Sequence, residues 1–481
     1  MPEPTSDPRP ASGVPGPVDL SVPRRVHIVG VGGSGMSAIA TVLAAMGHQV
    51  SGSDLKTSKA FERLRGLGVD VTIGHDAGNV GADVEIITRS TAIPDTNPEV
   101  VAAAERGLRV ASRAQTLAAI AATRSAIAVA GTHGKTTTSS MLAMILIEAG
   151  LEPSFIIGGD VTELATGAAW GGGEWFVIEA DESDGTFLTI PRRAAIVTNL
   201  EADHLEYWGG FERLRDAFAR FLAETDGPRI VCADDELAWS LGQSIGCVGY
   251  GTTADADYRL TDLELDRRGG RFVLWKGAER LGPLEVPMAG RHNAMNGAAA
   301  AVTALELGAP FDACARALAR FGGVARRFHP RGEVNGIVFI DDYAHLPSEI
   351  EVALDAAADG AWRRVVAVFQ PHRYSRTESL WDTFGEAFRR ADVLVITDIY
   401  AAGEQPRPGI SGKLIVQAVL DAHPWQRVVY LPHRADIVSF LVRELRSGDL
   451  CLTLGAGDLT TLPDEVLARL APPVSPPVPS P

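Results

Sequence analysis

Short apolar runs alternate with segments of helical periodicity along most of the chain. The apolar runs are rich in valine, isoleucine and alanine, which is typical of strands buried in a parallel sheet. The segments between them place apolar residues three and four positions apart, as on the buried face of a helix. This alternation of strands and helices predicts an α/β fold built on parallel sheets.

The alternation starts afresh three times, which indicates three domains. The first start is VHIVGVGG at 26–33, the second is SAIAVAGT at 125–132, and the third segment contains GIVFIDDY at 336–343. A chain of 481 residues is too long for one compact core, so its length agrees with this division. Further strands are predicted at 71–73, 84–88, 174–181, 193–200, 363–370, 391–400 and 449–457. The predicted domains cover residues 1–121, 122–327 and 328–481.

Both ends of the chain are rich in proline, over residues 1–22 and 471–481. Such segments bury little apolar surface, so we predict that both are disordered. The first residues also lack the basic start and apolar run of a signal peptide, and no stretch approaches the ~20 apolar residues of a membrane helix. The expected compartment is the cytoplasm, without membrane insertion.

The composition narrows the class of protein. A hydrophobic content of 46% and a charged content of 22% are ordinary for a globular protein. The net charge of −16 argues against a nucleic-acid partner, because phosphate backbones select basic surfaces, but local sites for small anions remain possible. The cysteines lie far apart without a CxxC pair, which indicates reduced, buried thiols rather than disulfides or zinc. They are Cys232, Cys247, Cys314 and Cys451.

A first glycine loop follows the first predicted strand. Gly30, Gly32 and Gly35 form GxGxxG before a predicted helix, and Asp54 ends the next strand. This spacing is typical of a dinucleotide site, where bare backbone approaches a pyrophosphate and an acid meets a ribose hydroxyl. Because the physical basis is a pyrophosphate at a helix N-terminus, any nucleoside diphosphate fits as well as NAD or FAD. A tight turn without a ligand is the structural alternative.

A second glycine loop, GTHGKTTT at 131–138, also lies between a strand and a helix. It is shorter than the general P-loop, since Val129 stands where that motif has its first glycine. Its backbone N–H groups are expected to cradle phosphate oxygens, Lys135 to reach the terminal phosphates, and the Thr136 hydroxyl to bind Mg²⁺. The alternative is a solvated loop with a chance GKT.

Acidic residues and a histidine follow two later strands of the same segment. Mg²⁺ prefers oxygen ligands, and Glu179 ends an apolar strand, where ligand sites of parallel sheets lie. Asp181, Glu182 and Asp184 compete with it for that role, and a solvated acidic turn is the structural alternative. His204 also closes a strand, beside Asn199 and Asp203, and could be either a ligand or a structural histidine.

Taken together, the motifs GTHGKTT, EADESD, TNLEADH, RHNAMN and DDYAHLPSEI, in this order, resemble the Mur ligases of peptidoglycan synthesis. The resemblance extends over about residues 24–460. It implies a Rossmann-like N-terminal domain for a UDP-sugar, a central P-loop ATPase-type domain for ATP and a Rossmann-like C-terminal domain for an amino acid. The motifs GVGGSGMSAIA, SGSD, STAIPDTNPEV, SRAQTLAAI, QPHRYSRT and DIYAAGE narrow it to members that act on UDP-N-acetylmuramate.

The resemblance implies that ATP activates the lactyl carboxylate of UDP-N-acetylmuramate as an acyl phosphate, which L-alanine then attacks. The implied cofactors are ATP and Mg²⁺, the partners are UDP-N-acetylmuramate and L-alanine, and the chain would be a monomer or a homodimer. The rivals are a ligase that re-attaches a recycled tripeptide to the same UDP-sugar, an NAD-dependent oxidoreductase that uses the first glycine loop, and a non-catalytic nucleotide-sensing module. We also expect the C-terminal domain to close when the ligands bind.

The site residues that the resemblance implies fall into four groups. The UDP-sugar group is Gly30, Gly32, Gly33, Ser34, Gly35, Met36, Asp54, Ser90, Thr91 and Arg113. The ATP group is Gly131, Thr132, His133, Gly134, Lys135, Thr136, Thr137, Asn293, Asn296, Arg326 or its neighbour Arg327, and Asp341 or its neighbour Asp342. The metal group is Thr136, Glu179 and His204. The catalytic group is Lys135, His204, His345, Arg373 and Arg376, and Tyr343 belongs to the amino-acid region.

Two catalytic roles stay open at this point. His345 either takes a proton from the alanine amine or only positions the substrate. Arg373 or Arg376 is expected to clamp the alanine carboxylate, with structural pairing to acids such as Glu378 as the alternative.

The sequence departs from the family pattern at two positions. Leu346 stands where many relatives carry a second histidine, which leaves the polarity of the amino-acid pocket open, and Gln115 stands where glutamate is usual. Residues 205–223 contain no lysine, whereas other Mur ligases carry a carbamylated lysine soon after the DH motif. That absence fits the alanine-adding member and its near relatives.

Overall fold

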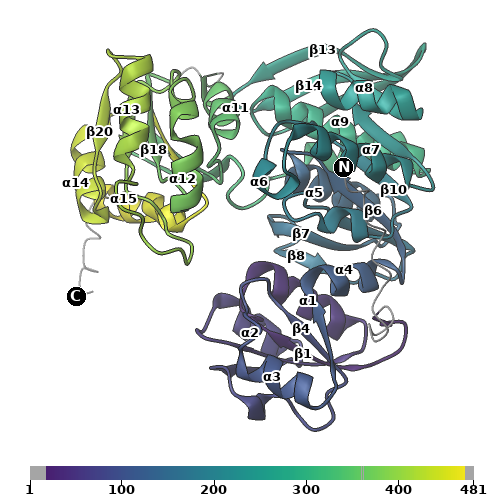
Figure 1. Ribbon diagram of the computed structural model, residues 1–481. Helices are drawn as coiled ribbons and strands as arrows, with labels where there is room; N and C mark the ends of the chain where they lie inside the picture. The colour runs from purple at the N-terminus through teal and green to yellow at the C-terminus, as the bar shows by residue number, and fades with distance from the viewer. Residues whose placement is uncertain (1–17, 359, 361, 472–481) are drawn as a thin grey trace, which may run out of the picture.

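The computed structural model describes residues 18–358, 360 and 362–471. Within them the strands form separate N-terminal, central and C-terminal sheets, each of which is the middle of one body of the molecule (Figure 1). The N-terminal body lies below the central body in this view, and the C-terminal body lies at its side. Most neighbouring strands are parallel and helices cover the sheets, so the predicted α/β class is confirmed.

The predicted disorder of residues 1–22 and 471–481 falls almost entirely outside the described residues. Where the two overlap, the Leu20 side chain is only 3% exposed and packs into the apolar core. An apolar side chain that reaches the core fixes the chain around it, so ordered packing begins before residue 22.

In the N-terminal sheet, β1 (Arg25–Val29) is the middle strand of the order β3-β2-β1-β4-β5. The strand order reverses between β1 and β4, and ligands of open parallel sheets bind at such a reversal, beyond the carboxyl ends of the strands. The first glycine loop follows β1 and therefore lies at this position. The other elements are β2 (Gln49–Asp54), β3 (Asp70–Ile73), β4 (Ile86–Arg89), β5 (Arg109–Ser112), α1 (Ser34–Ala45), α2 (Lys59–Gly66), α3 (Pro98–Glu105) and α4 (Arg113–Ala121).

The central sheet has the order β15-β14-β13-β12-β11-β10-β6-β9-β7-β8, with β6 (Ser125–Ala130) between β10 and β9. After β6 comes α5 (Lys135–Glu148), which is buried along almost its whole length because it packs against the sheet, α9 and α10. The strands are β7 (Ser154–Val161), β8 (Thr166–Ala169), β9 (Trp175–Glu179), β10 (Ala194–Val197), β11 (Arg229–Cys232), β12 (Val248–Gly251), β13 (Tyr258–Asp266), β14 (Gly269–Lys276) and β15 (Glu279–Val286). The helices are α6 (Leu205–Trp208), α7 (Phe211–Ala223), α8 (Glu236–Ile245), α9 (Arg291–Glu306) and α10 (Phe311–Ala319).

The C-terminal sheet has the order β16-β17-β21-β18-β19-β20, and the edge strand β16 (His329–Val334) runs antiparallel to β17 (Ile337–Asp342). The remaining neighbours are parallel. The other strands are β18 (Arg364–Phe369), β19 (Val393–Ile396), β20 (Val428–Tyr430) and β21 (Asp449–Leu454). The helices are α11 (Pro347–Ala358), α12 (Tyr374–Leu380), α13 (Lys413–Ala422), α14 (Arg434–Glu444) and α15 (Leu462–Leu470).

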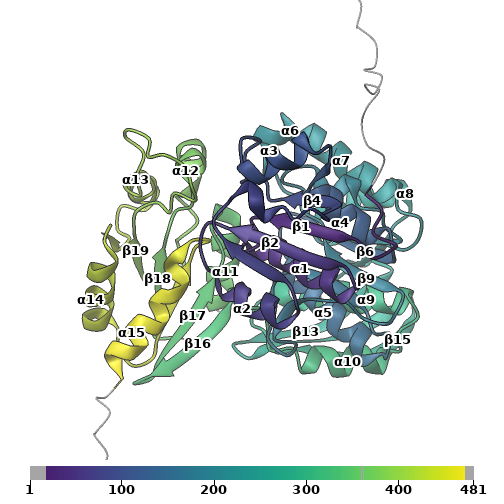
Figure 2. The same cartoon turned by 90° about the horizontal axis from the view of Figure 1, so that it is seen from below.

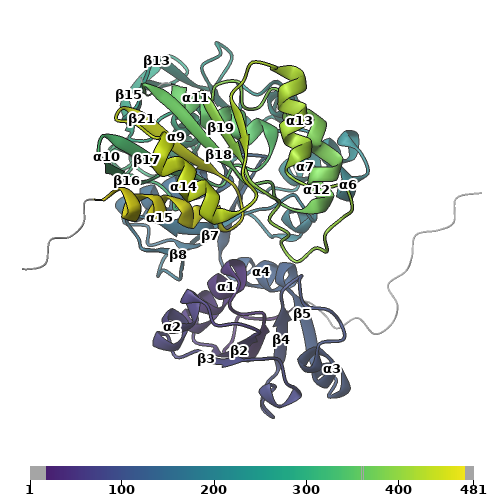
Figure 3. The same ribbon diagram turned by 90° about the vertical axis from the view of Figure 1, so that its left-hand side faces the viewer.

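The bodies meet in two places. Helix α1 of the N-terminal body packs against β7 and β8 of the central body. Helix α11 lies on the side of the C-terminal body that faces the central body (Figures 1 and 2). The view onto the C-terminal body shows that the N-terminal body lies beneath both of the others (Figure 3). No helix of the described residues is long and apolar enough to cross a membrane.

Candidate active site

The second glycine loop connects β6 to α5 at the carboxyl end of the central sheet. Gly131 and Gly134 adopt φ angles of 129° and 82°, which favour glycine over any other residue. A Cβ atom at Gly131 would collide with Thr198, and one at Gly134 would collide with Asn296. The loop conformation therefore requires both glycines.

Residues at the end of β10 hold this loop in place. The Asn199 side chain accepts a hydrogen bond from the His133 N–H (2.8 Å), and the Thr198 hydroxyl donates to the His133 carbonyl (2.5 Å). Helix α5 begins at Lys135, so the N–H groups of its first turn have no partner within the helix. A fixed loop followed by a helix N-terminus is suited to binding phosphate groups.

Lys135 has a buried carboxylate partner. Its ammonium donates to both oxygens of Glu182 (2.9 and 3.0 Å) and to the Gly131 carbonyl (2.6 Å). Burial opposes the charge, but the carboxylates of Glu182 and Asp181 outweigh it and raise the pKa of Lys135. The lysine is therefore cationic, and Glu182, one of the acids that the sequence left in competition, is its counter-ion.

Thr136 and Glu179 form the other polar pair beside the loop. The Thr136 hydroxyl lies 3.0 Å from each Glu179 carboxylate oxygen, and the Gly158 N–H donates to the same carboxylate (2.8 Å). A hydroxyl and a carboxylate are oxygen ligands of the kind that Mg²⁺ prefers, so both residues fit that ion. In the part of the chain that the structure describes, no group of three or more His, Cys, Asp or Glu residues is arranged to hold a metal.

His204 lies apart from this pair. It has a left-handed backbone (φ 53°) directly before α6, and its ring nitrogen Nε2 is 3.2 Å from the Asp203 carboxylate. It lines a different cavity from the one that Glu179 lines, and both cavities are described below. Thus Thr136 and Glu179 are brought into contact, and the contribution of His204 to a metal site stays a prediction.

A cavity runs from the first glycine loop to the central body. Most of the predicted UDP-sugar residues line it, namely Gly33, Ser34, Gly35, Met36, Ser90, Thr91 and Arg113. The same cavity contains Glu179 and Asp181. Asp54 accepts a hydrogen bond from the Gly32 N–H (2.9 Å), so its carboxylate shapes the loop. A molecule that is bound at the loop can therefore extend to the Thr136–Glu179 pair.

A second cavity lies between the central and C-terminal bodies. From the central body it is lined by His133, Gly134, Thr136, Thr137, His292, Asn293 and Asn296, and from the C-terminal side by Arg327, Phe328, Asp342, Glu349, Val352 and Ala353. Burial, and then the charge of His133, lower the pKa of His292 to about 4, so that ring is neutral. Asn293 and Asn296, which were predicted to bind ATP, thus line one cavity with residues of the second glycine loop (131–138, called the P-loop from here on) and of the C-terminal body.

Arg327 and Asp342 line this cavity, whereas their neighbours Arg326 and Asp341 are not among its lining residues. Arg326 donates instead to the carbonyls of Gly455 (2.8 Å) and Gly457 (3.0 Å) inside the C-terminal body. Asp341 is 1% exposed and accepts hydrogen bonds from two threonine hydroxyls of that body, Thr453 (2.6 Å) and Thr460 (2.5 Å). Both side chains have partners inside the C-terminal body, which favours Arg327 and Asp342 as the ATP residues, and the assignment of Arg326 and Asp341 to ATP stays a prediction.

A third cavity adjoins the other side of the P-loop. It is lined by Thr132, Glu201, Ala202, Asp203, His204, Leu205, Leu346, Pro347, Ser348, Arg373, Ser375, Arg376, Ser379, Leu380 and Thr383. The predicted clamps Arg373 and Arg376 are therefore placed together with His204. Leu346, with Leu205 and Leu380, gives this cavity an apolar part.

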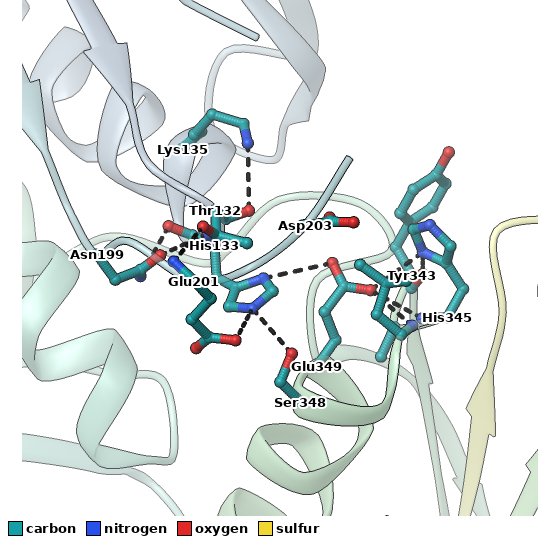
Figure 4. Close-up of polar contacts among 12 residues, drawn as sticks. Thr132, His133, Lys135, Asn199, Glu201, Asp203, Tyr343, His345, Ser348 and Glu349 are labelled. Atoms are coloured by element: carbon teal, nitrogen blue, oxygen red, sulfur yellow. Dashed lines mark hydrogen bonds and ion pairs between the residues drawn. The ribbon is translucent and has the colours of Figure 1, made fainter. Parts of the chain in front are cut away.

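His345 is not among the residues that line this cavity. Its ring nitrogen Nδ1 lies 3.1 Å from the Tyr343 carbonyl and 3.1 Å from the Glu349 carboxylate (Figure 4). Its ring also packs edge-on against His372, which in turn contacts Arg376 (3.2 Å). His345 therefore lies at the border of the third cavity, and its side chain contacts residues of the C-terminal body.

The His133 side chain connects the central and C-terminal bodies. Its Nε2 lies 3.2 Å from Glu201 and 3.1 Å from the Ser348 hydroxyl, and its Nδ1 lies 3.7 Å from Glu349 (Figure 4). Burial opposes the charged ring, but the two carboxylates outweigh it and raise the pKa of His133 to about 9. The P-loop histidine is thus a cation between carboxylates of both bodies. From the sequence, His133 was predicted only to bind ATP, and no role was predicted for Glu201, Ser348 or Glu349. A glutamate at the third position of a helix, as at Glu349, is a known helix-start signal.

Family models match consecutive parts of the chain. They are "Mur ligase family, catalytic domain" at residues 25–125, "Mur ligase middle domain" at residues 129–304, and "Mur ligase, glutamate ligase domain" at residues 326–457. The chain is 45% identical over 452 residues to the UDP-N-acetylmuramate–L-alanine ligase of Pelotomaculum thermopropionicum, covering 93% of this chain and 98% of the relative. It is 43% identical over 453 residues to the protein of the same name from Desulforamulus reducens, with the same coverage.

Solved structures show the same likeness. The UDP-N-acetylmuramate–alanine ligase of Thermotoga maritima has a TM-score of 0.79 and 29% identity, covering 93% of this chain and 99% of that one. A murein peptide ligase from Psychrobacter arcticus has a TM-score of 0.69 and 26% identity, covering 94% and 100%. The alanine ligase is the more similar of the two in fold.

Proposed function

Because the chain belongs to the Mur ligase family, we propose that it joins L-alanine to the lactyl carboxylate of UDP-N-acetylmuramate at the expense of ATP, an early step of peptidoglycan synthesis. The family resemblance inferred from the motifs is confirmed by the family models and the curated relatives. ATP and Mg²⁺ are the proposed cofactors, and UDP-N-acetylmuramate and L-alanine the proposed partners. The cytoplasm and a monomeric or homodimeric state remain predictions.

One observation supports this function above the others. The cavity that begins at the first glycine loop contains Glu179 and Asp181, beside the P-loop. A UDP-sugar whose pyrophosphate binds at the start of α1 would therefore extend its acyl end toward the phosphates of ATP. An enzyme that phosphorylates a carboxylate of a sugar nucleotide needs this arrangement.

The first chemical step is phosphoryl transfer. An oxygen of the lactyl carboxylate attacks the terminal phosphorus of ATP, the bond to the ADP oxygen breaks, and an acyl phosphate forms. Catalysis of such a transfer depends mainly on positioning and on stabilising negative charge. Lys135 and the first N–H groups of α5 supply positive charge at the phosphates. Thr136 and Glu179 would hold Mg²⁺, which when bound neutralises phosphate charge.

The second step is attack by the amine. The unprotonated nitrogen of L-alanine bonds to the acyl carbon, phosphate leaves, and the nitrogen loses a proton. Arg373 and Arg376 line the third cavity, and we expect them to bind the alanine carboxylate there. His345 lies at the border of that cavity with its Nδ1 turned to Tyr343 and Glu349. The carboxylate at Nδ1 orients the ring, an arrangement that serves a positioning residue and equally a base that acts through Nε2.

Phosphate release from ATP tests the proposal. It would be measured with and without UDP-N-acetylmuramate, across L-alanine, glycine, L-serine and the L-Ala-γ-D-Glu-diaminopimelate tripeptide. Release that requires both the UDP-sugar and L-alanine supports the function. Release with the tripeptide but not with alanine assigns the chain to the recycling ligases, and silence under every combination, in folded protein that binds ATP, refutes a ligase. An NAD-dependent oxidoreductase would leave the P-loop, Lys135 and Glu179 without a role.

A further inference from the structure

Glu349 is the third residue of α11 and divides its carboxylate between two sets of partners. Its Oε2 accepts hydrogen bonds from the N–H groups of His345 (2.9 Å) and Leu346 (3.2 Å), and it also lies 3.1 Å from the His345 ring. Its Oε1 faces the Nδ1 of His133 at 3.7 Å (Figure 4). One side chain therefore contacts both the P-loop and the loop before α11.

The contact with His133 is an ion pair whose atoms are too far apart for a hydrogen bond. The His133 Nδ1 is buried and has no hydrogen-bond acceptor among the described residues, although the Glu349 carboxylate faces it. The opposite nitrogen is held by Glu201 and Ser348. Catalytic contacts are often long before the ligands arrive and shorten in the complex. A small movement of the C-terminal body toward the P-loop would bring Glu349 within hydrogen-bond distance of His133.

The same loop carries the residue that acts on ATP. His133 precedes Lys135 by two positions, and its backbone is fixed by Asn199 and Thr198. The P-loop backbone is thus held in place, and the His133 side chain connects it to α11. On the other side, Glu349 is the only carboxylate among the described residues that contacts the His345 ring.

We propose that Glu349 is a positioning residue that couples docking of the C-terminal domain on the P-loop, through His133, to the orientation of His345 at the amino-acid cavity. Where His345 is concerned, the inference rests on the proposed function. When the domains separate, Glu349 no longer contacts His133 and keeps only its contacts with the loop before α11, which carries His345. When the domains dock, His133 fixes the Glu349 carboxylate, and this carboxylate in turn fixes the imidazole of His345.

The substitution Glu349→Gln isolates this role. The glutamine oxygen still accepts the N–H groups of His345 and Leu346, so the start of α11 is preserved, but the charge that faces His133 is gone. We expect kcat for L-alanine ligation to fall about 10- to 100-fold, as for a catalytic group displaced by about an ångström. The KM for UDP-N-acetylmuramate should not change, because its cavity does not include Glu349. Glu349→Asp, which keeps the charge, should recover part of the loss.

Glu351→Gln is the matched control. Glu351 lies on the same helix, is exposed and carries the same charge. It should leave kcat unchanged. His133→Gln supplies the other arm of a double-mutant cycle with Glu349→Gln. If the two residues act through one contact, the double variant loses little more than the worse single variant. Additive losses, or equal losses in Glu351→Gln, would overturn the proposal.

A second readout needs no substrate. Small-angle X-ray scattering of the unliganded protein should show a larger radius of gyration for His133→Gln and Glu349→Gln than for the wild type and Glu351→Gln. Identical scattering in all four would refute the coupling of the domains. If the wild type ligates no amino acid while the scattering difference is present, the proposed function fails and the docking contact stands. Circular dichroism of each variant establishes that it is folded.

Discussion

The ammonium of Lys135 and the carboxylate of Glu182 form a buried ion pair, with N–O distances of 2.9 and 3.0 Å. Both side chains are largely removed from water, with exposures of 13% and 2%. Each charge therefore depends on the other, and the lysine that we propose to act on ATP also has a structural function.

Lys135→Ala should remove phosphate release and also destabilise the central domain by about 3–5 kcal/mol, because it leaves the Glu182 charge buried without a partner. The double variant Lys135→Met with Glu182→Gln removes both charges. It should recover most of the melting temperature, measured by calorimetry, but none of the activity. If the single variant melts at the wild-type temperature, the pair is not a structural one.

Arg326 and Arg327 should respond to substitution in opposite ways. Arg327→Ala is expected to raise the KM for ATP at least about tenfold with little change in stability, since its side chain lines the cavity between the domains. Arg326→Ala should instead lower stability by about 1.5–3 kcal/mol through the loss of its bonds to Gly455 and Gly457. Steady-state kinetics and thermal unfolding of both variants test this pair. The reverse pattern would return the ATP contact to Arg326.

The backbone at Arg373 is strained. Its φ of 71° and ψ of 139° lie in a region that non-glycine residues occupy at a cost of about 1–3 kcal/mol. Arg373→Gly and Arg373→Ala should both raise the KM for L-alanine at least about tenfold, because both remove the guanidinium. Only the glycine variant relieves the strain, so it should melt at a higher temperature than the alanine variant. Equal melting temperatures would show that the strain is absent in solution.

Docking through His133 should depend on pH. The pKa of this ring is about 9 in the folded protein, above the ordinary value of about 6.5, so its ion pairs contribute fully below pH 6.5 and are lost as the pH rises through 9. The pKa values of Glu201 and Glu349 are lowered, so protonation of these carboxylates weakens the ion pairs only below their ordinary pKa of about 4.3. The difference in melting temperature between the wild type and His133→Gln should therefore shrink between pH 6.5 and 9. A difference that is constant over this range would mean that the ring is neutral.

The sequence predicted the elements whose geometry is local. Each glycine loop could be placed because a strand, a glycine turn and a helix follow one another within a few residues, and this order alone puts phosphate-binding N–H groups at a sheet edge. The antiparallel strands β13–β15 were not predicted. Short turns join them directly, whereas the prediction rested on strands that alternate with helices.

The sequence could not decide between neighbours. Arg326 and Arg327 are adjacent and chemically identical, and both guanidinium groups lie over the Tyr343 ring. Only the structure shows that Arg326 also binds the carbonyls of Gly455 and Gly457, whereas Arg327 lines the cavity between the bodies. Asp341 and Asp342 differ in the same way, because successive residues of β17 face opposite sides of the sheet. The contact of His133 with Glu349 joins two domains across more than two hundred positions, and no local pattern indicates it.

The separation of the three sheets has a consequence for how amine specificity can change. Arg373, Arg376 and Leu346 all belong to the C-terminal body, whereas Lys135, Thr136 and Glu179 belong to the central body. Mutations at these C-terminal positions would therefore reshape one wall of the proposed amine pocket without replacing the residues proposed to act on ATP. An enzyme with this architecture can therefore acquire a new amine substrate, in evolution or by exchange of the C-terminal body, while the residues that activate the carboxylate stay the same.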